Sequence, residues 1–311
     1  MSDNQQQADI QVLGRDAVVN LLPKRVQNSH KGTYGHVLNI AGSSQYQGAA
    51  YLSSVSSLKV GAGYCMLASC SDVINTVATN TPDITFLNLD QSPFGTIPKD
   101  AIKYVSAIAN YDVVSIGCGL NQVGGVEDFV INFLKKNRNS YTPIIIDADA
   151  INIMAKSKFY SMPLNSLITP HPMELSRLMG VEVKEIQQNR AKWAWEASKE
   201  FDCIVLLKGH ETVIAVPNGK IFINHTGNSA LAKAGTGDVL TGMIAGFCAQ
   251  GIALEAAACA GAYIHGIASE IASKAMTEYC VLASDLIKYI PLAMKAIIQS
   301  NQRLDSWSSL S

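Results

Sequence analysis

The most informative stretch of the chain is Ala234-Gly235-Thr236-Gly237-Asp238-Val239-Leu240-Thr241-Gly242, where two glycines and a carboxylate directly precede an apolar helical run. Glycines let backbone N–H groups turn toward one point, and a helix N-terminus adds positive potential there. Such a segment can hold a phosphate or a developing oxyanion. Asp238 is then either a helix cap or a base that accepts an alcohol's proton during phosphoryl transfer.

Short apolar runs rich in Val and Ile alternate with longer segments of small residues on both sides of this stretch. The runs predicted as strands are 36–41, 64–69, 84–89, 113–117, 144–147, 167–169 and 204–208. The segments predicted as helices are 48–61, 99–109, 124–137, 172–179, 184–200, 237–249 and 254–273, with a last helix from Leu282. This order predicts a three-layer α/β/α fold, with a mostly parallel central sheet and helices on both faces.

The pattern changes near the C-terminal third, where Asn218-Gly219 joins the runs 212–217 and 221–224. An Asn-Gly pair between apolar runs is typical of a tight hairpin, so we expect an antiparallel extension of the sheet. The absence of a linker or repeat predicts one domain over 29–300. We expect a tail and a lead-in helix in 1–28, with residues 1–10 frayed, and a polar tail in 301–311.

Composition limits the classes of function. The chain has 311 residues, 48% of them hydrophobic, and a net charge of -1, which provides no field for gripping nucleic acid. No apolar run reaches the roughly 18 residues of a membrane span, and no signal-peptide pattern opens the sequence. We therefore expect a cytoplasmic protein with small-molecule partners. The seven cysteines lack metal-site spacing and are predicted to be buried free thiols.

Gly-Thr-Gly-Asp before a helix resembles the anion-hole and catalytic-base motif of the ribokinase superfamily. Further segments are similar to those of the NAD(P)H-hydrate dehydratases, in the same order along the chain. They are Lys31-Gly-Thr-Tyr-Gly-His36, Gly42-Ser43, Gln47-Gly48-Ala49, Ile116-Gly-Cys-Gly-Leu120, Asp147-Ala-Asp-Ala150, Leu167-Ile-Thr-Pro-His-Pro-Met-Glu174, Lys208-Gly-His-Glu-Thr212 and Thr226-Gly-Asn228.

The resemblance implies repair of a damaged reduced nicotinamide cofactor. The family removes the hydroxyl that hydration adds at carbon 6 of the S form of hydrated NADH or NADPH. Phosphorylation by a nucleotide turns that hydroxyl into a phosphate ester, which is then eliminated. The resemblance favours ADP over ATP as the co-substrate, yielding AMP and phosphate, together with Mg²⁺. It also implies a homo-oligomer resembling a tetramer, and an epimerase on a separate chain.

The resemblance assigns roles residue by residue. Asp238 is the base and also contacts substrate, and the amides of Gly235, Thr236 and Gly237 stabilise the moving charge. Glu174 helps to organise Mg²⁺ through water. The residues expected at the nucleotide are Lys208, Gly209, His210, Glu211, Thr212, Thr226, Asn228 and Gly237. The other residues expected at the substrate are Ala49, Gly119 and His171.

Each assignment has a purely structural alternative. Lys208 can be a solvated lysine at a strand end, while Glu174 can be the carboxylate of a capping box and His171 a loop residue. Asp147 and Asp149 lie at a strand end, and we expect one of them to be a cap and the other to shape the loop or lie near the site. His265 is predicted to be packed. Cys118, where the family usually has proline, has no neighbouring base and is not expected to be a nucleophile.

Two other functions remain open. A kinase of the same fold could act on hydroxymethylpyrimidine or hydroxyethylthiazole, although Thr-Pro-His-x-x-Glu argues against it because those kinases more often have asparagine before x-x-Glu. A non-catalytic nucleotide-binding regulator is the alternative from another class. The carboxylate of Asp238 disfavours it, because a pure binder gains nothing from a carboxylate that faces phosphate.

Overall fold

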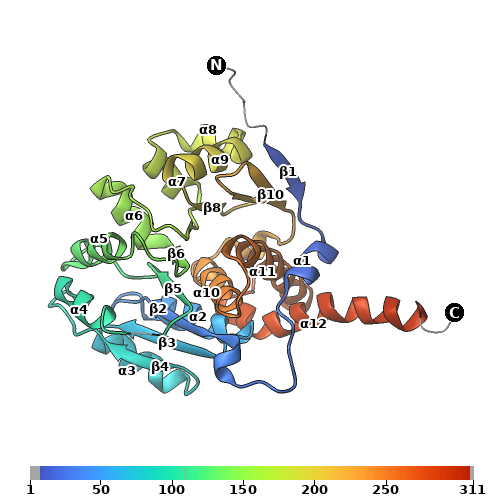
Figure 1. Ribbon diagram of the computed structural model, residues 1–311, viewed down its shortest axis with the longest axis horizontal. Coiled ribbons are helices and arrows are strands. Elements are labelled where there is room, and N and C mark those ends of the chain that lie inside the picture. Colours follow the sequence, from blue (N-terminus) through green and yellow to red (C-terminus); the bar gives the residue numbers. More distant parts are fainter. Residues whose placement is uncertain (1–7, 109, 309–311) are drawn as a thin grey trace.

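A ten-stranded sheet forms the centre of the protein (Figure 1). The computed structural model describes residues 8–108 and 110–308, without the side chains of 300–308. The sheet order is β1-β10-β9-β8-β7-β6-β5-β2-β3-β4. β9 runs antiparallel to both of its neighbours, and the other pairs are parallel. The strands are β1 Asp9–Val12, β2 His36–Ile40, β3 Tyr64–Ser69, β4 Thr85–Asn88, β5 Val113–Ile116, β6 Ile144–Ile146, β7 Ser166–Ile168, β8 Ile204–Leu207, β9 Thr212–Ala215 and β10 Lys220–Asn224.

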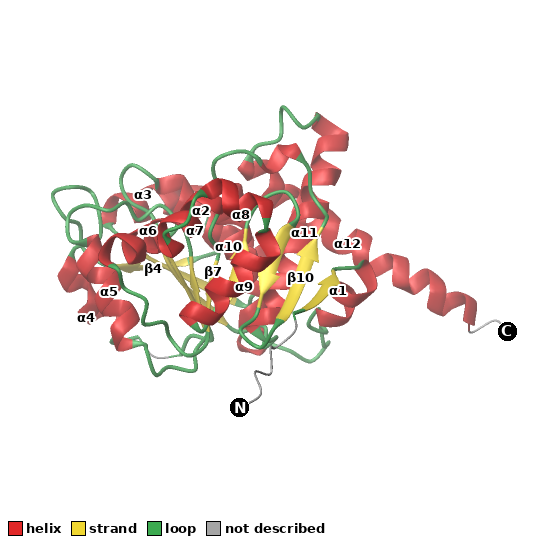
Figure 2. Ribbon diagram, turned by 90° about the horizontal axis from the view of Figure 1, so that it is seen from above, coloured by secondary structure: helices red, strands yellow, loops and turns green. Residues whose placement is uncertain are grey.

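Helices cover both faces of this sheet, which confirms the predicted three-layer fold (Figure 2). One face carries α1 Arg15–Leu21, α2 Gln47–Lys59, α3 Ser71–Asn80, α10 Thr236–Ala249, α11 Leu254–Met276 and α12 Ala283–Ser308. The other face carries α4 Ile102–Val105, α5 Val126–Lys136, α6 Ala148–Ser157, α7 Pro172–Met179, α8 Val183–Gln188 and α9 Arg190–Phe201.

Alternation along each strand divides the core into two layers. Ile145 belongs to the core layer that contains α10 and α11, whereas its neighbours Ile144 and Ile146 belong to the layer on the opposite face, which contains α5 and α6. Successive side chains of a strand point to opposite faces, so a strand buried on both sides must be apolar throughout. This requirement explains the unbroken Ile and Val runs from which the strands were predicted.

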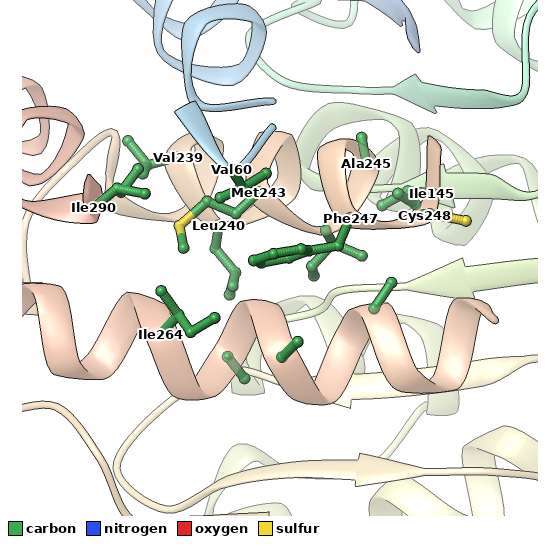
Figure 3. Close-up of a cluster of buried hydrophobic side chains, with 14 of the residues drawn as sticks. Val60, Ile145, Val239, Leu240, Met243, Ala245, Phe247, Cys248, Ile264 and Ile290 are labelled. Carbon is green, nitrogen blue, oxygen red and sulfur yellow. The ribbon is translucent and has the colours of Figure 1, made fainter. Parts of the chain in front are cut away.

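Helix α10 lies between α2 and α11 and carries Asp238 in its first turn. Figure 3 shows the side chains of Met243 and Phe247 lying between α10 and α11, with Ile264 on the α11 side. On the side facing α2, Gly242 and Gly246 let the two helices approach closely, because a Cβ atom at either glycine would lie within 2.2 Å of an α2 carbonyl oxygen. The position of Asp238 is thus set by tight packing on both sides of its helix.

Several predicted elements were wrong in detail. Residues 9 and 10, expected to be frayed, belong to β1, which runs parallel to β10. Helices α3 and α6 were not predicted, because their polar residues and short length weaken the helical pattern. The helix predicted over 184–200 is broken at Asn189 into α8 and α9, and the one predicted over 99–109 shrinks to a 3-10 turn followed by α4. Cys280 is exposed, whereas the other six cysteines are buried as predicted.

The motif that runs from Lys31–Tyr34 into strand β2, which starts at His36, has a structural explanation. Gly35 has φ +71°, and a Cβ there would lie 1.9 Å from the carbonyl oxygen of Ala249 at the end of α10. Only glycine fits this close approach.

Within the described residues, no helix is both long and apolar enough to cross a bilayer.

Candidate active site

The candidate site lies where the carboxyl ends of β5, β6, β7 and β8 meet the N-terminus of α10. The loops that leave these strands carry Cys118, Asp147, His171 and Lys208 in turn. Backbone hydrogen bonds extend the sheet into these loops: the Asp147 amide donates to Ile116, and the Lys208 amide donates to Pro170 at 2.8 Å. Ligands of open α/β sheets bind at this edge, so the architecture brings the sequence motifs to the expected place.

Asp238 is half-buried in the first turn of α10. Burial, and then the negative charge of Asp147, raise the pKa of its carboxyl to about 6. Desolvation disfavours the charged carboxylate, and a nearby carboxylate has the same effect. A carboxyl with a pKa near 6 is ionised at neutral pH but holds a proton more readily than an exposed aspartate, which suits a general base.

The loop before α10 presents free backbone donors. Gly235 has φ +89° and serves as the N-cap residue. The amides of Gly235, Gly237 and Asp238 make no hydrogen bond within the described part of the chain, whereas the Thr236 amide makes a 3.4 Å bond to Lys233. The Thr236 hydroxyl turns back to donate to the carbonyls of Leu231 and Lys233. Free amides at a helix N-terminus are the donors that the predicted anion site requires.

The ammonium group of Lys208 lies among carboxylates beside this loop. Its Nζ is 2.7 Å from Asp147 Oδ1 and 4.0 Å from Glu174 Oε2. A Cβ atom at Gly237 would be 3.4 Å from the same Nζ, so the ammonium also borders the first turn of α10. Burial alone would lower the pKa of Lys208, but Asp147 and Glu174 outweigh it and raise that pKa, so the lysine stays charged.

His171 and Glu174 form the capping box that the sequence allowed as an alternative. His171 Nδ1 accepts hydrogen bonds from the amides of Met173 and Glu174, and Glu174 Oε2 accepts one from the His171 amide at 2.8 Å. Because Nδ1 accepts, a neutral His171 carries its proton on Nε2, which faces Glu174 Oε1 at 3.4 Å. Burial, followed by Lys208, lowers the pKa of His171. Burial raises that of Glu174 to about 7.

Ala49 and Gly119, two predicted substrate contacts, lie together. A Cβ at Gly119 would be 2.7 Å from the Cβ of Ala49, and Gly119 has φ +63°. The preceding Cys118 is buried, and its Sγ donates to Asp147 Oδ2 at 3.7 Å. The Sγ of Cys118 and carboxylate oxygens of Asp147 and Asp238 all lie within 4.8 Å of one another. Burial and then Asp238 raise the pKa of Cys118 well above its usual value, so it remains a thiol and a poor nucleophile, as predicted.

The segment from Lys208 to Thr212 is a tight loop between β8 and β9. Gly209 has φ +141° and lies against the guanidinium of Arg190, which donates to the carbonyls of Leu207 and Lys208. The Thr212 hydroxyl donates to the Gly209 carbonyl at 3.0 Å. His210 and Glu211 are exposed, so these two predicted nucleotide contacts lie on the outer side of the loop.

The loop containing Thr226 and Asn228 borders a large hollow. A cavity of about 840 Å³ is lined by Asn228, Ser229, Lys233, Glu270, Ser273, Lys274, Thr277, Glu278 and Tyr279. Glu270 accepts a hydrogen bond from the Gly227 amide at 2.8 Å, and the Asn228 side chain accepts one from Ser273. This hollow has the size of a small-molecule site. By contrast, the Thr226 hydroxyl bonds to Asn224 and to the Tyr263 carbonyl, inside the protein.

Comparison with known proteins identifies the family. The family model described as NAD(P)H-hydrate dehydratase matches residues 37–292, which include the site from Ala49 to Asp238. The chain belongs to the NAD(P)H-hydrate dehydratase family. Its sequence is 34% identical to the ADP-dependent (S)-NAD(P)H-hydrate dehydratase of Bacillus subtilis over 277 residues, covering 88% of this chain and 94% of that protein.

Two further comparisons place this dehydratase-family chain among longer proteins and solved structures. It is 37% identical to the bifunctional NAD(P)H-hydrate repair enzyme Nnr of Moorella thermoacetica, over 88% of this chain and 52% of that protein. The chain therefore spans about half the length of the bifunctional relatives. A Bacillus subtilis ADP/ATP-dependent NAD(P)H-hydrate dehydratase, co-crystallised with ATP/Mg²⁺, superimposes with a TM-score of 0.79 at 33% identity, covering 91% of this chain and 97% of that one.

The structure of this dehydratase-family chain adds residues to the site that the sequence analysis missed. Thr241 donates to Asp147 at 2.6 Å, and Arg190 holds the carbonyls on either side of the Lys208 amide. As predicted, one of the two aspartates is a cap: Asp147 follows the end of β6 and is the N-cap residue of α6. Asp149 accepts from the Asn121 amide and shapes the Gly119 loop. His265 is buried as predicted.

Proposed function

We propose that this protein removes water from the S form of hydrated NADH or NADPH at the expense of ADP, restoring the reduced cofactor. The observation that carries the proposal is the arrangement of Asp238. A carboxylate with a raised pKa lies at the start of α10, beside free amides of Gly235 and Gly237 and the charged Lys208. A base, an anion site and a cation together are what phosphoryl transfer to an alcohol requires.

In the proposed reaction, the oxygen of the carbon 6 hydroxyl attacks the terminal phosphorus of ADP, and Asp238 accepts the proton of that hydroxyl. The bond between that phosphorus and the bridging oxygen breaks, and AMP leaves. The ring nitrogen's lone pair then expels the phosphate as the carbon 5 proton departs to solvent, which restores the ring double bond. The sum is hydrated cofactor plus ADP giving reduced cofactor, AMP and phosphate, so the removed water ends in the hydrolysed phosphate bond.

The remaining assignments also belong to this proposal. Lys208 and the free amides of Gly235 and Gly237 bind the nucleotide's phosphates, and Thr226 and Asn228 border the adenosine, which the neighbouring hollow has room to accept. His171, with its proton on Nε2, contacts the substrate together with Ala49 and Gly119. The homo-oligomeric state, the cytoplasmic location and the pairing with a separate epimerase stay predictions.

The donor set fits a hard divalent cation. Glu174 offers a buried carboxylate, and Mg²⁺ prefers carboxylate oxygens together with phosphates and water. Bound Mg²⁺ would neutralise charge on the nucleotide's phosphates and orient them. Glu174 would hold it through water, while its contact with the His171 amide keeps the carboxylate in place. In this protein, Lys208 supplies a further positive charge next to the same carboxylate.

One assay tests the proposal and its alternatives. The purified protein is mixed with the S form of hydrated NADH, Mg²⁺ and either ADP or ATP, and the recovery of reduced-nicotinamide absorbance is followed. We expect recovery with ADP, one AMP and one phosphate for each NADH, and none when the nucleotide is left out. Lack of recovery with both nucleotides would reject the proposal. A stable phosphate ester of hydroxymethylpyrimidine or hydroxyethylthiazole, formed in parallel reactions, would show a vitamin kinase instead.

A further inference from the structure

The buried carboxylate of Asp147 joins segments from across the site. Oδ1 accepts from the Ala148 amide at 2.8 Å and from Lys208 Nζ at 2.7 Å. Oδ2 accepts from the Thr241 hydroxyl at 2.6 Å and from Cys118 Sγ at 3.7 Å. Asp147 is 1% exposed. A buried charge needs such partners, and here they come from α6, α10 and the loops after β5 and β8.

The hydrogen bond between Asp147 and Thr241 affects the position of Asp238, the proposed base. Thr241 follows Asp238 by three residues on α10, and residues three apart lie on neighbouring positions of one helix face. Anchoring Thr241 to the end of β6 therefore restricts the rotation of the first turns of α10. The carboxylate of Asp238 itself lies within 4.8 Å of Cys118 Sγ and of a carboxylate oxygen of Asp147.

The bond to Lys208 has a second effect. The ammonium borders Gly237, directly before Asp238, so it lies close to the carboxylate that must accept a proton. Within the described residues, however, the carboxylates within 4.0 Å of Lys208 Nζ are those of Asp147 and Glu174. An ion pair with Lys208 would stabilise the ionised form of Asp238 and weaken it as a base.

We infer that Asp147 is a positioning residue for Asp238: its bond to Thr241 fixes the first turns of α10, and its ion pair with Lys208 keeps the ammonium away from the Asp238 carboxylate. This inference rests on the proposed function of Asp238 as the base. Asp147 acts through Thr241 and Lys208, the two groups that it holds.

The charged and titratable groups that face Asp238 are Asp147, Lys208, Cys118 and Asp149. Asp147→Asn removes one negative charge and releases Lys208, and both changes favour the ionised form of Asp238. We therefore expect the acid limb of kcat/KM to move down by about one pH unit. We also expect kcat to fall about 100-fold, as for a misplaced catalytic group, with the Kd of Mg–ADP within about threefold of the parent.

The Thr241 bond is tested separately with a matched pair. Thr241→Val keeps the shape but loses the hydroxyl, so we expect kcat to fall while the acid limb stays in place, because no charge changes. Thr241→Ser keeps the hydroxyl and recovers most of the rate. Asp202→Asn removes an exposed carboxylate at the end of α9 and serves as the control for the change of net charge.

A readout that needs no turnover separates this inference from the proposed function. The titration of Asp238 is followed by carboxyl ¹³C NMR in the nucleotide-free parent and in Asp147→Asn, with Asp238→Asn used to assign the signal. If the parent fails to repair hydrated NADH but its Asp238 titration shifts down in Asp147→Asn, the proposed function fails while the control of Asp238 by Asp147 stands. An unchanged titration, or a folded Asp147→Asn variant with the parent's kcat, would overturn the inference.

Discussion

Gly242 of α10 lies directly against the carbonyl oxygen of Ser53 in α2, at a distance that leaves no space for a side chain. A Cβ atom there would be 2.0 Å from that oxygen and 2.1 Å from Ser56 Oγ. Both neighbours belong to a buried helix face and cannot move aside independently. The close approach holds the helix that carries Asp238.

We expect Gly242→Ala to lower the free energy of unfolding by about 3 kcal/mol, because the added methyl group forces the two helices apart. Chemical denaturation measures the change. Gly48→Ala, where a Cβ meets nothing within 4 Å, is the control and should leave stability unchanged or slightly higher. Equal stability of Gly242→Ala and the parent would mean that the helices are not packed in this way.

Asp238→Asn tests the proposed role of Asp238 as the base directly. The amide keeps the shape of the side chain but cannot accept the proton, so we expect turnover to fall by roughly three orders of magnitude or more. Mg–ADP should bind about as well as to the parent, which isothermal titration calorimetry can measure. Near-normal turnover in this variant would remove Asp238 from the mechanism.

The pH dependence of activity follows from the raised pKa of Asp238. Because that pKa is about 6, we expect kcat/KM to decline as the pH falls through this value, where the carboxyl takes up the proton that blocks it. Glu174, with a pKa of about 7, is the other candidate for such a limb. The limb should remain near its original position in Glu174→Gln. Its disappearance in that variant would assign it to Glu174.

The raised pKa of Asp238 also means that its ionised carboxylate lowers the free energy of unfolding. Its folded-state pKa of about 6 exceeds the ordinary value of 3.8, so the unfolded chain binds fewer protons between these values and stability falls as the pH rises through this window. Asp238→Asn should therefore be more stable than the parent by about 1–2 kcal/mol above the window, with allowance for partial exposure. The extra stability of Asp238→Asn should nearly vanish at about pH 4. Denaturation curves of both proteins, recorded at about pH 4 and above the window, test this expectation.

Thiol reactivity distinguishes Cys280 from the other cysteines. Cys280 is exposed, while the remaining six are buried. A thiol-specific chromogenic reagent should modify one cysteine rapidly in the native protein and all seven after unfolding in denaturant. Cys280→Ser should abolish the rapid phase. Rapid modification of Cys118 in the native protein, identified by peptide mass, would contradict its burial beside Asp147.

The amino-acid sequence alone was enough to predict the layered fold and the place of the principal motifs. Val and Ile runs such as Ile144–Ile146 are apolar at every position because both faces of their strand are buried, and that requirement is visible in one dimension. The glycines before Asp238 likewise predict an anion site from the local sequence, because the glycine conformations and the helix start involve adjacent residues. Lys208 and His171 were identified through contiguous motifs at strand ends.

Tertiary structure decided what depends on partners far along the chain. Strand β1 exists because its backbone pairs with β10, and its four exposed side chains carry no strand pattern of their own. The carboxylate of Asp147 accepts hydrogen bonds from Lys208, 61 residues away in the sequence, and from Thr241, 94 residues away. The sequence determined which residues could do chemistry. Only the fold decided that the buried carboxylate of Asp147 holds both Lys208 and the helix that carries Asp238, because the energy of a buried charge depends on the groups that surround it.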